Sequence, residues 1–325
     1  MEEKLFEQRI DLTSLSKAVT DIRTEIGRVI VGQYKMVDLL MIGLLSDGHI
    51  LIEGVPGVAK TLIAKLLAKI IDVGFSRIQF TPDLMPSDVL GTSVFNSKVA
   101  EFQFKKGPIF SNIILIDEIN RAPAKTQSAL FEVMEECQVT IDGVTHPMDF
   151  PFIVLATQNP IEQEGTYRLP EAQLDRFLFK IDVKYPSVSE EISILVNQHS
   201  QTQNALLDNV NKVLSAQQIA QYRQTIHSII IEPKLIEFIA KIVNETRNNP
   251  SLYLGASPRA SLAILRAAKA NAAIKGRDFV TPEDIIEMTE PVMRHRIILT
   301  PEKEMEGITA DELIETIIKN IEIPR

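Results

Sequence analysis

The chain has 325 residues, of which 45% are hydrophobic and 24% charged, a globular balance with length for about two domains. Its formal net charge of -9 disfavours a bulk attraction to nucleic acid or anionic lipid. Cys137 is the only cysteine, which excludes an intrachain disulfide and a cysteine zinc cluster. With no secretory signal and no apolar run near the roughly 20 residues of a membrane span, we expect a cytoplasmic protein without a membrane span.

The first part of the chain alternates helical and strand-like patterns. Apolar residues spaced three and four apart predict an amphipathic helix within residues 11–30, and helical spacing resumes at Met36–Leu45. The apolar run His49–Glu53 ends at a glycine and predicts a buried strand. A helix at Leu62–Ile71 and a second strand at Phe75–Thr81 follow.

Two hairpins and three more buried strands are expected further along. Alternating residues within 93–104 predict one hairpin, and Asp142-Gly143 predicts another within 139–148. A helix is expected at Ala124–Glu136, where Pro123 is tolerated in the first turn. The further strands are Asn112–Ile116, Phe152–Thr157 and Phe177–Val183.

These elements predict an α/β fold whose parallel sheet is covered by helices on both faces. The pattern changes after Pro186. From about Ser189 onward no run looks like a strand, and helical periodicity alone is found at 189–201, 215–230, 233–248, 257–276 and 282–294. We therefore expect an αβα core with its N-terminal helix at residues 1–186 and a helical domain at residues 187–325. Ligands of such sheets bind beyond the carboxyl ends of the strands.

A phosphate-binding loop is indicated at Gly54–Thr61 (GVPGVAKT), between an apolar strand and a helix. Backbone N–H groups of such a loop converge on phosphates at the helix N-terminus. Lys60 is expected to reach the β- and γ-phosphates of ATP, and the Thr61 hydroxyl to bind Mg²⁺. Ala59 stands where this motif usually has glycine, which requires a helical backbone at that position.

Two carboxylates, Asp117 and Glu118, end the apolar strand IILIDE. Asp117 is a candidate ligand of Mg²⁺, and Glu118 is a candidate to orient and polarise the attacking water. Solvated loop charges are the alternative reading of the pair taken alone. The upstream Lys60-Thr61 pair makes a joint hydrolytic site the stronger interpretation.

Three further polar residues follow candidate strands or open a helix. Asn159 follows the strand Phe152–Thr157 and is a candidate to position water, while a turn-forming Asn-Pro dipeptide is the equal alternative. Arg176 precedes the last strand, and Arg259 opens a helix of the second domain. Either arginine could stabilise charge on the transferred phosphoryl group, although an ion pair at a helix end is the commoner fate of an arginine.

Taken together, these motifs resemble the AAA+ ATPase family, and within it the MoxR branch, one of the branches with an insert in helix 2. The resemblance covers about residues 30–295. The matching stretches are Ile30–Gln33 (IVGQ), Gly48–Thr61 (GHILIEGVPGVAKT), Gln79–Gly91 (QFTPDLMPSDVLG), Gly107-Pro108, Ile116–Pro123 (IDEINRAP), Ala129–Glu136, Ala156–Pro160, Leu169–Phe177 (LPEAQLDRF) and Gly255–Ala260 (GASPRA). Ala59 is a departure that this branch tolerates.

The resemblance implies a role for each candidate residue. Glu118, Asn159, Arg176 and Arg259 would be catalytic, with Asn159 as sensor 1, Arg259 as sensor 2 on a lid that closes over the γ-phosphate, and Arg176 as the arginine finger. Arg168 and Arg121 lie near Arg176 in the sequence and could share its role. Thr61 and Asp117 would bind Mg²⁺. The nucleotide-binding residues would be Val31, Gly32, Gln33, Gly54, Val55, Pro56, Gly57, Val58, Ala59, Lys60, Thr61 and Leu62, of which the first three border the adenine.

The resemblance also implies a homo-oligomeric ring, usually a hexamer, with both hairpins near its central pore. The family is described as chaperone-like, remodelling or maturing partner proteins that often bear a von Willebrand factor A domain. A nucleic-acid motor is one alternative, but the hairpin at 139–148 has no Lys or Arg and 93–106 offers Lys98, Lys105 and Lys106. A metal-chelatase subunit is another alternative, and the sequence distinguishes it only weakly from a protein remodeller. A non-hydrolysing nucleotide sensor is disfavoured because Lys60, Asp117 and Glu118 are all present.

Overall fold

The computed structural model describes residues 9–55, 57, 60–98, 100–160, 165–200 and 207–324. Its centre is a five-stranded sheet in the order β2-β5-β8-β1-β9, in which every pair of neighbours is parallel. The strands are β1 (His49–Gly54), β2 (Phe75–Gln79), β5 (Ile113–Asp117), β8 (Ile153–Gln158) and β9 (Phe177–Val183). The expected α/β fold with a parallel sheet is confirmed.

Helices cover both faces of this sheet because the strand residues alternate between two cores. Ile50 and Ile52 of β1 face one core, together with α1 (Thr13–Gly27), α2 (Tyr34–Leu45) and α3 (Lys60–Ile70). Leu51, between them, faces the other core with α4 (Pro86–Leu90) and α5 (Ala124–Glu136). The same alternation recurs in β5 and β8, so each buried strand contributes to both cores.

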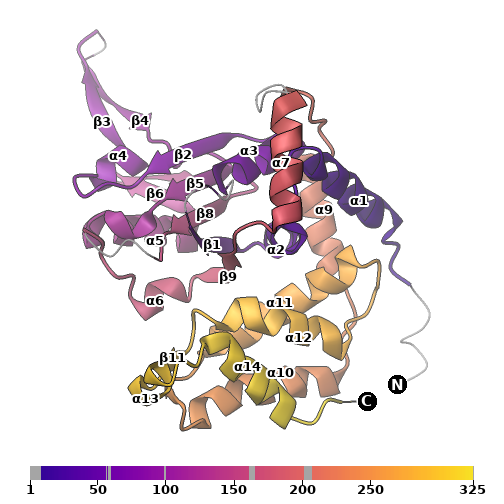
Figure 1. The fold of residues 1–325 in the computed structure, drawn as a ribbon. Helices are drawn as coiled ribbons and strands as arrows, with labels where there is room; N and C mark the ends of the chain where they lie inside the picture. Colours follow the sequence, from indigo (N-terminus) through magenta and orange to yellow (C-terminus); the bar gives the residue numbers. More distant parts are fainter. Residues whose placement is uncertain are drawn as a thin grey trace.

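Both expected hairpins are present. One consists of β3 (Gly91–Asn96) and β4 (Glu101–Lys106), and it projects away from the body of the molecule (Figure 1). The other consists of β6 (Gln138–Ile141) and β7 (Val144–Pro147), joined at the predicted Asp142-Gly143 turn. Asp142 and Gly143 both have positive φ, which is the backbone that such a two-residue turn requires.

The chain after β9 is mostly helical, and α10 to α14 lie below the sheet in Figure 1. Its helices are α7 (Val188–Ser200), α9 (Ala216–His227), α10 (Pro233–Asn248), α11 (Pro258–Ile274), α12 (Pro282–Met293), α13 (Pro301–Met305) and α14 (Ala310–Asn320). The expectation that no strand follows Ser189 is wrong, because β10 (Leu252–Leu254) pairs with β11 (Ile298–Leu299). Strands of two or three residues are too short to produce a periodic pattern. Among the described residues, no helix combines the length and hydrophobicity needed to cross a membrane.

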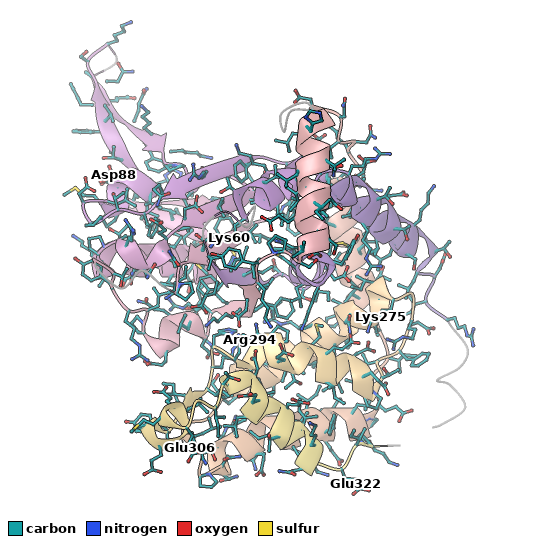
Figure 2. All side chains as sticks on the ribbon, in the orientation of Figure 1. Lys60, Asp88, Lys275, Arg294, Glu306 and Glu322 are labelled. Carbon is teal, nitrogen blue, oxygen red and sulfur yellow. The ribbon has the colours of Figure 1, made fainter. Side chains whose placement is uncertain are left out.

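The helical part packs tightly against the sheet. One apolar cluster runs from α1, α2 and α3 through the sheet into α9, α10, α11 and α12. Arg294, just beyond α12, lies at the junction between the sheet and the C-terminal helices (Figure 2). Arg296 is buried there as well, donating to the carbonyl of Leu178 and pairing with Asp175 at 2.7 Å. The two halves of the chain therefore share a core and a buried ion pair.

His295 is buried at this junction, and its ionisation opposes folding. Its Nε2 lies 2.9 Å from the carbonyl of Phe177, while Nδ1 is buried without a partner among the described residues. Burial, reinforced by the charge of Arg296, holds the pKa of His295 well below its usual 6.5. A depressed pKa means that the unfolded chain binds the proton more readily, so stability should fall as the pH drops below about 6.5.

We expect the unfolding free energy to fall by about 1 kcal/mol more in the wild type than in His295→Gln when the pH is lowered from 7.5 to 5.5. The glutamine amide can donate to the same carbonyl but does not titrate. Urea unfolding at the two pH values measures the difference. Equal losses of stability in both proteins would show that His295 does not cause the acid sensitivity.

Candidate active site

The phosphate loop connects the carboxyl end of β1 to α3. Lys60 is the first residue of α3, and its Nζ donates to the Gly54 carbonyl at 2.6 Å. A Cβ on Gly54 would lie 2.9 Å from the Val183 carbonyl oxygen, and Gly57 has a φ of +89°, so both positions require glycine. Pro56, Val58 and Ala59 lie outside the described residues, and their nucleotide contacts remain predictions.

The surroundings of Lys60 favour the binding of an anion. Burial lowers the pKa of Lys60, and the carboxylates of Asp117, Glu118 and Glu53 oppose that shift from nearby. Its one described hydrogen bond goes to a neutral carbonyl. A phosphate group at the N-terminus of α3 would give this ammonium a close counter-charge. Thr61 and Leu62 follow on the first turn of the same helix, both partly buried.

Asp117 ends β5 and is held by two donors. Arg77 Nε donates to its Oδ2 at 2.6 Å, and the Thr157 hydroxyl donates to its Oδ1 at 3.2 Å. The side chain is 12% exposed, which positions a carboxylate firmly at the sheet edge. Arg77 was not predicted from the sequence. The available signal was its alternation with the buried Ile78, which places it on the same face of β2 as Gln79.

Glu118 has left-handed backbone angles, with φ of 57° and ψ of 53°, so the chain turns sharply directly after the strand. Its Oε2 accepts from Gln79 Nε2 at 2.8 Å and pairs with Arg121 Nε at 3.1 Å. Its N–H donates to the Thr157 hydroxyl at 3.1 Å. Strained backbone of this kind is often found at functional sites. The carboxylate is thus fixed at the edge where Lys60 also lies.

Asn159 lies between the phosphate loop and the acidic pair. Strand β8 is hydrogen-bonded on one side to β1 and on the other to β5, and its Gln158 is in register with Glu53 of β1. Asn159 is the next residue after this strand, beside the start of the phosphate loop. The strand order therefore brings Lys60, Asp117, Glu118 and Asn159 to one edge of the sheet, as the sequence predicts for a ligand site.

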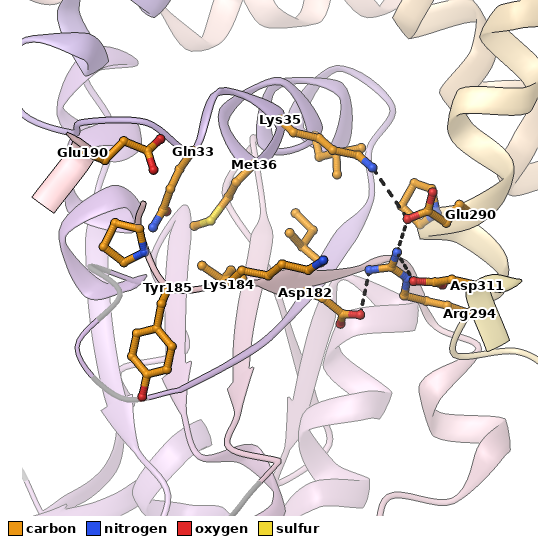
Figure 3. A pocket seen from close by; sticks show the side chains of 15 residues that line it. Gln33, Lys35, Met36, Asp182, Lys184, Tyr185, Glu190, Glu290, Arg294 and Asp311 are labelled. Carbon is orange, nitrogen blue, oxygen red and sulfur yellow. Dashed lines mark hydrogen bonds and ion pairs between the residues drawn. The ribbon is translucent and has the colours of Figure 1, made fainter. Parts of the chain in front are cut away.

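A pocket of about 400 Å³ opens beside this edge, between the core and the C-terminal helices (Figure 3). Gln33 and Tyr185 line it, and Gln33 comes from the segment expected to border adenine. Gln33 Oε1 is buried and has no hydrogen-bond partner among the described residues. Gly32 and Gln33 both have positive φ, and Val31 is half-buried beside them. An unpaired buried acceptor suits the amino group of a purine base.

Arg294 on the far wall of this pocket was missed by the sequence analysis. It pairs with Asp182 at 3.0 Å and with Asp311 at 2.8 Å, and it also contacts Glu290 (Figure 3). Lys35 reaches Glu290 at 3.6 Å. Because Asp182 belongs to β9 and Asp311 to α14, this arginine ties the helical domain to the rim of the pocket.

The residues present fit ATP and Mg²⁺. The phosphate loop supplies a lysine and a helix N-terminus, and the adjoining pocket supplies an acceptor without a partner among the described residues. Asp117 at the end of β5 and Thr61 on α3 offer oxygen ligands of the kind that Mg²⁺ prefers. The phosphate loop and the acids are candidates that the sequence analysis names. It did not find Arg77, Gln79, Lys184, Tyr185 and Arg294, whose placement depends on neighbouring strands and helices.

The two expected catalytic arginines lie at the opposite edge of the sheet. Arg176 directly precedes β9, whose Phe177 is in register with His49, the first residue of β1. Arg176 and Arg259 both pair with Glu135 at the end of α5, at 2.6 and 2.7 Å. Five strand steps of about 3.3 Å separate this edge from Gly54. The structure therefore brings Arg176 and Arg259 together, but not to the phosphate loop of their own chain.

The expectation that the Arg259 lid closes over a γ-phosphate did not specify which chain binds that phosphate, and in this structure Arg259 lies away from the phosphate loop of its own chain. The reason lies in how the domain docks: α11 begins beside the amino-terminal edge of the sheet, where Ser257 at its N-cap donates to Asp175 at 2.8 Å. The two alternative candidates for the arginine finger lie away from Arg176 and have other partners. Arg121 pairs with Glu118, and Arg168 is 82% exposed beside Glu171.

Two family models match the chain, one over the αβα core and one over the helical domain. An ATPase family associated with various cellular activities (AAA) matches residues 49–179, and an AAA lid domain matches residues 244–317. The chain is 45% identical to an uncharacterised protein, YeaC, of Bacillus subtilis over 95% of each chain. It is 44% identical to Chaperone MoxR1 of Mycobacterium tuberculosis, covering 97% of this chain and 84% of that one.

A solved structure is similar over nearly the full length. The crystal structure of a candidate ATPase from Cytophaga hutchinsonii shares 46% identity, covers 96% of this chain and 97% of its own, and superposes with a TM-score of 0.89. The phosphate loop, the acidic strand end and the helical lid lie in the regions that these comparisons cover. The chain belongs to the MoxR family of AAA+ ATPases.

Proposed function

We propose that this ATPase works as a homo-oligomeric ring, a hexamer, that couples ATP hydrolysis to chaperone-like remodelling of partner proteins. The observation that carries the proposal is the separation of the site into two edges. Lys60 and Glu118 lie at one edge of the sheet, and Arg176 and Arg259 at the other. A subunit that offers its arginine edge to the phosphate-loop edge of the next copy completes a site that one chain leaves incomplete.

We propose a role for each residue of the site. Lys60 binds the β- and γ-phosphates, and Thr61 and Asp117 hold Mg²⁺, which would neutralise charge on the phosphate oxygens. Glu118 accepts a hydrogen bond from the attacking water, while Asn159 positions that water from the neighbouring strand end. Arg176 and Arg259 of the adjacent copy stabilise the charge that develops on the transferred phosphoryl group.

Exposed apolar groups on the projecting hairpin favour a protein client. Phe95 and Phe102 stack edge to face with centroids 5.3 Å apart, and they are 53% and 73% exposed. The other hairpin carries no Lys or Arg to contact a phosphate backbone. Apolar surface of this kind suits contact with a polypeptide. We propose a client with a von Willebrand factor A domain from the family resemblance, and one of the most similar relatives bears the name chaperone.

Removing the Lys60 ammonium should remove most of the affinity for nucleotide. We expect Lys60→Ala to bind ATP about 100-fold more weakly, because a buried anion then loses its charged partner. Titration with a fluorescent ATP analogue measures the change. Lys65→Ala, on an exposed face of the same helix, is the matched control and should bind normally. Unchanged affinity in Lys60→Ala would refute the phosphate-loop assignment.

The remodelling activity is tested by trapping the client. Glu118→Gln should hold ATP and its client together, so affinity capture in ATP should recover a specific protein that is absent in ADP. The double variant Lys60→Ala/Glu118→Gln is the control for nucleotide-independent binding. Recovery of nucleic acid would favour a motor acting on DNA or RNA. Recovery of a porphyrin-metal insertion complex would favour the chelatase alternative.

A further inference from the structure

At the arginine edge of the sheet, one carboxylate occupies the place that the proposed function gives to a phosphate. Glu135 directs one oxygen to each arginine: Oε2 lies 2.6 Å from Arg176 Nη2, and Oε1 lies 2.7 Å from Arg259 Nη2. One oxyanion bridging two guanidinium groups is also the arrangement expected for the terminal phosphate of ATP. Glu135 and a neighbour's γ-phosphate therefore compete for the same donors.

The surroundings carry an excess of positive charge. A pocket of about 300 Å³ at this edge is lined by four arginines, Arg176, Arg259, Arg266 and Arg296, against three carboxylates, Asp47, Glu135 and Asp175. Arg296 is paired with the partly buried Asp175. Arg176 Nε is buried and has no acceptor among the described residues, so it remains available as a donor even while Glu135 is in place. An incoming dianion would find more donors here than one carboxylate uses.

The position of Glu135 in its helix also shows that the arginines hold it there. Glu132, Glu135 and Glu136 lie in the last turns of α5, which has no basic residue in its final turn. Negative charge at a helix C-terminus is unfavourable, and the two arginines offset it for Glu135. The side chains of Arg259, Arg176 and Glu135 are 52%, 28% and 37% exposed, so solvent weakens both ion pairs. The carboxylate is therefore held loosely enough to be displaced.

We propose that Glu135 is an intrachain stand-in for the neighbouring subunit's γ-phosphate, which keeps Arg176 and Arg259 occupied until a nucleotide-bound copy docks and displaces it. The inference rests on the proposed action of these arginines between subunits. Glu135 sets the concentration of protein needed to form active rings and leaves the rate of the assembled ring unchanged. The ligand of the pocket is the terminal phosphate of a nucleoside triphosphate on a second copy.

The test is steady-state ATPase activity of the full chain as a function of protein concentration. We expect Glu135→Gln, and equally Glu135→Ala, to reach half-maximal specific activity at about fivefold lower protein concentration than the wild type, with the same plateau. Glu136→Gln is the matched control, because it removes the same charge from the same turn and makes no ion pair with either arginine among the described residues. It should behave as the wild type does.

Each other outcome overturns a different part of the proposal. A lower maximal specific activity in Glu135→Gln would mean that Glu135 orients the arginines for catalysis, and the proposal that it replaces the γ-phosphate would be wrong. A curve identical to that of Glu136→Gln would also refute it. If Arg176→Ala and Arg259→Ala leave the plateau unchanged, the proposed ring site itself fails. Wild-type specific activity that does not depend on protein concentration would refute the control of ring assembly by Glu135.

Discussion

Glu118→Gln is expected to bind ATP with wild-type affinity and to hydrolyse it about 1000-fold more slowly. The amide keeps the shape of the side chain and can still bond to Gln79, which donates to Glu118 at 2.8 Å. It cannot accept the proton of the attacking water. Phosphate release under single-turnover conditions measures the chemical step, and titration with an ATP analogue measures the binding.

The left-handed backbone at Glu118 makes the choice of variant important. A glutamine adopts this conformation as readily as a glutamate, whereas a β-branched residue would strain the turn. Glu245→Gln, on an exposed face of α10, controls for the loss of one carboxylate and should hydrolyse ATP at the wild-type rate. If Glu118→Gln turned over ATP within a few fold of the wild-type rate, another group would have to accept the proton of the attacking water. Loss of ATP affinity would instead give Glu118 a role in binding.

Residues of the site that follow their own strand were predictable from the sequence. The apolar runs before Gly54 and Asp117 predicted buried parallel strands, and parallel strands align their carboxyl ends at one edge. The loop and the acids could thus be placed together without knowing the strand order. Arg77 and Gln79 reach the same site from the middle and end of β2. Their role depends on β2 being the neighbour of β5, which no local pattern specifies.

The position of the lid was not predictable for a related reason. The helices of the lid follow from periodicity, and Pro258 marks the start of α11. Where that helix docks depends on groups far apart in sequence, such as Ser257 with Asp175 and Arg296 with the carbonyls of β9. The motif around Arg259 therefore named a candidate residue but could not show whether it faces the nucleotide of its own chain or that of a neighbouring copy. The same long-range docking brings Glu135 between two arginines.

Arg176→Ala is expected to lower the ATPase rate of the assembled protein about 1000-fold while nucleotide binding is retained. Arg176 stacks over Phe131 at 5.9 Å and precedes β9, so its guanidinium is held at the amino-terminal edge of the sheet. Its removal leaves the phosphate loop of its own chain intact. The defect should therefore appear in the copy that receives the arginine.

Mixing the variant with the wild type tests this directly. If the arginine acts between subunits, each Arg176→Ala copy silences the site of its neighbour, and a ring that needs coordinated sites loses activity more steeply than in proportion to the variant fraction. Arg259→Ala should give the same curve, because both arginines lie at one pocket. Arg168→Ala tests the alternative arginine finger. Because the exposed Arg168 side chain pairs with Glu171 rather than with Glu135, this variant should not reduce the activity of mixed rings. A strictly proportional loss would mean that the sites hydrolyse ATP without coordination, and the coordinated ring would be wrong.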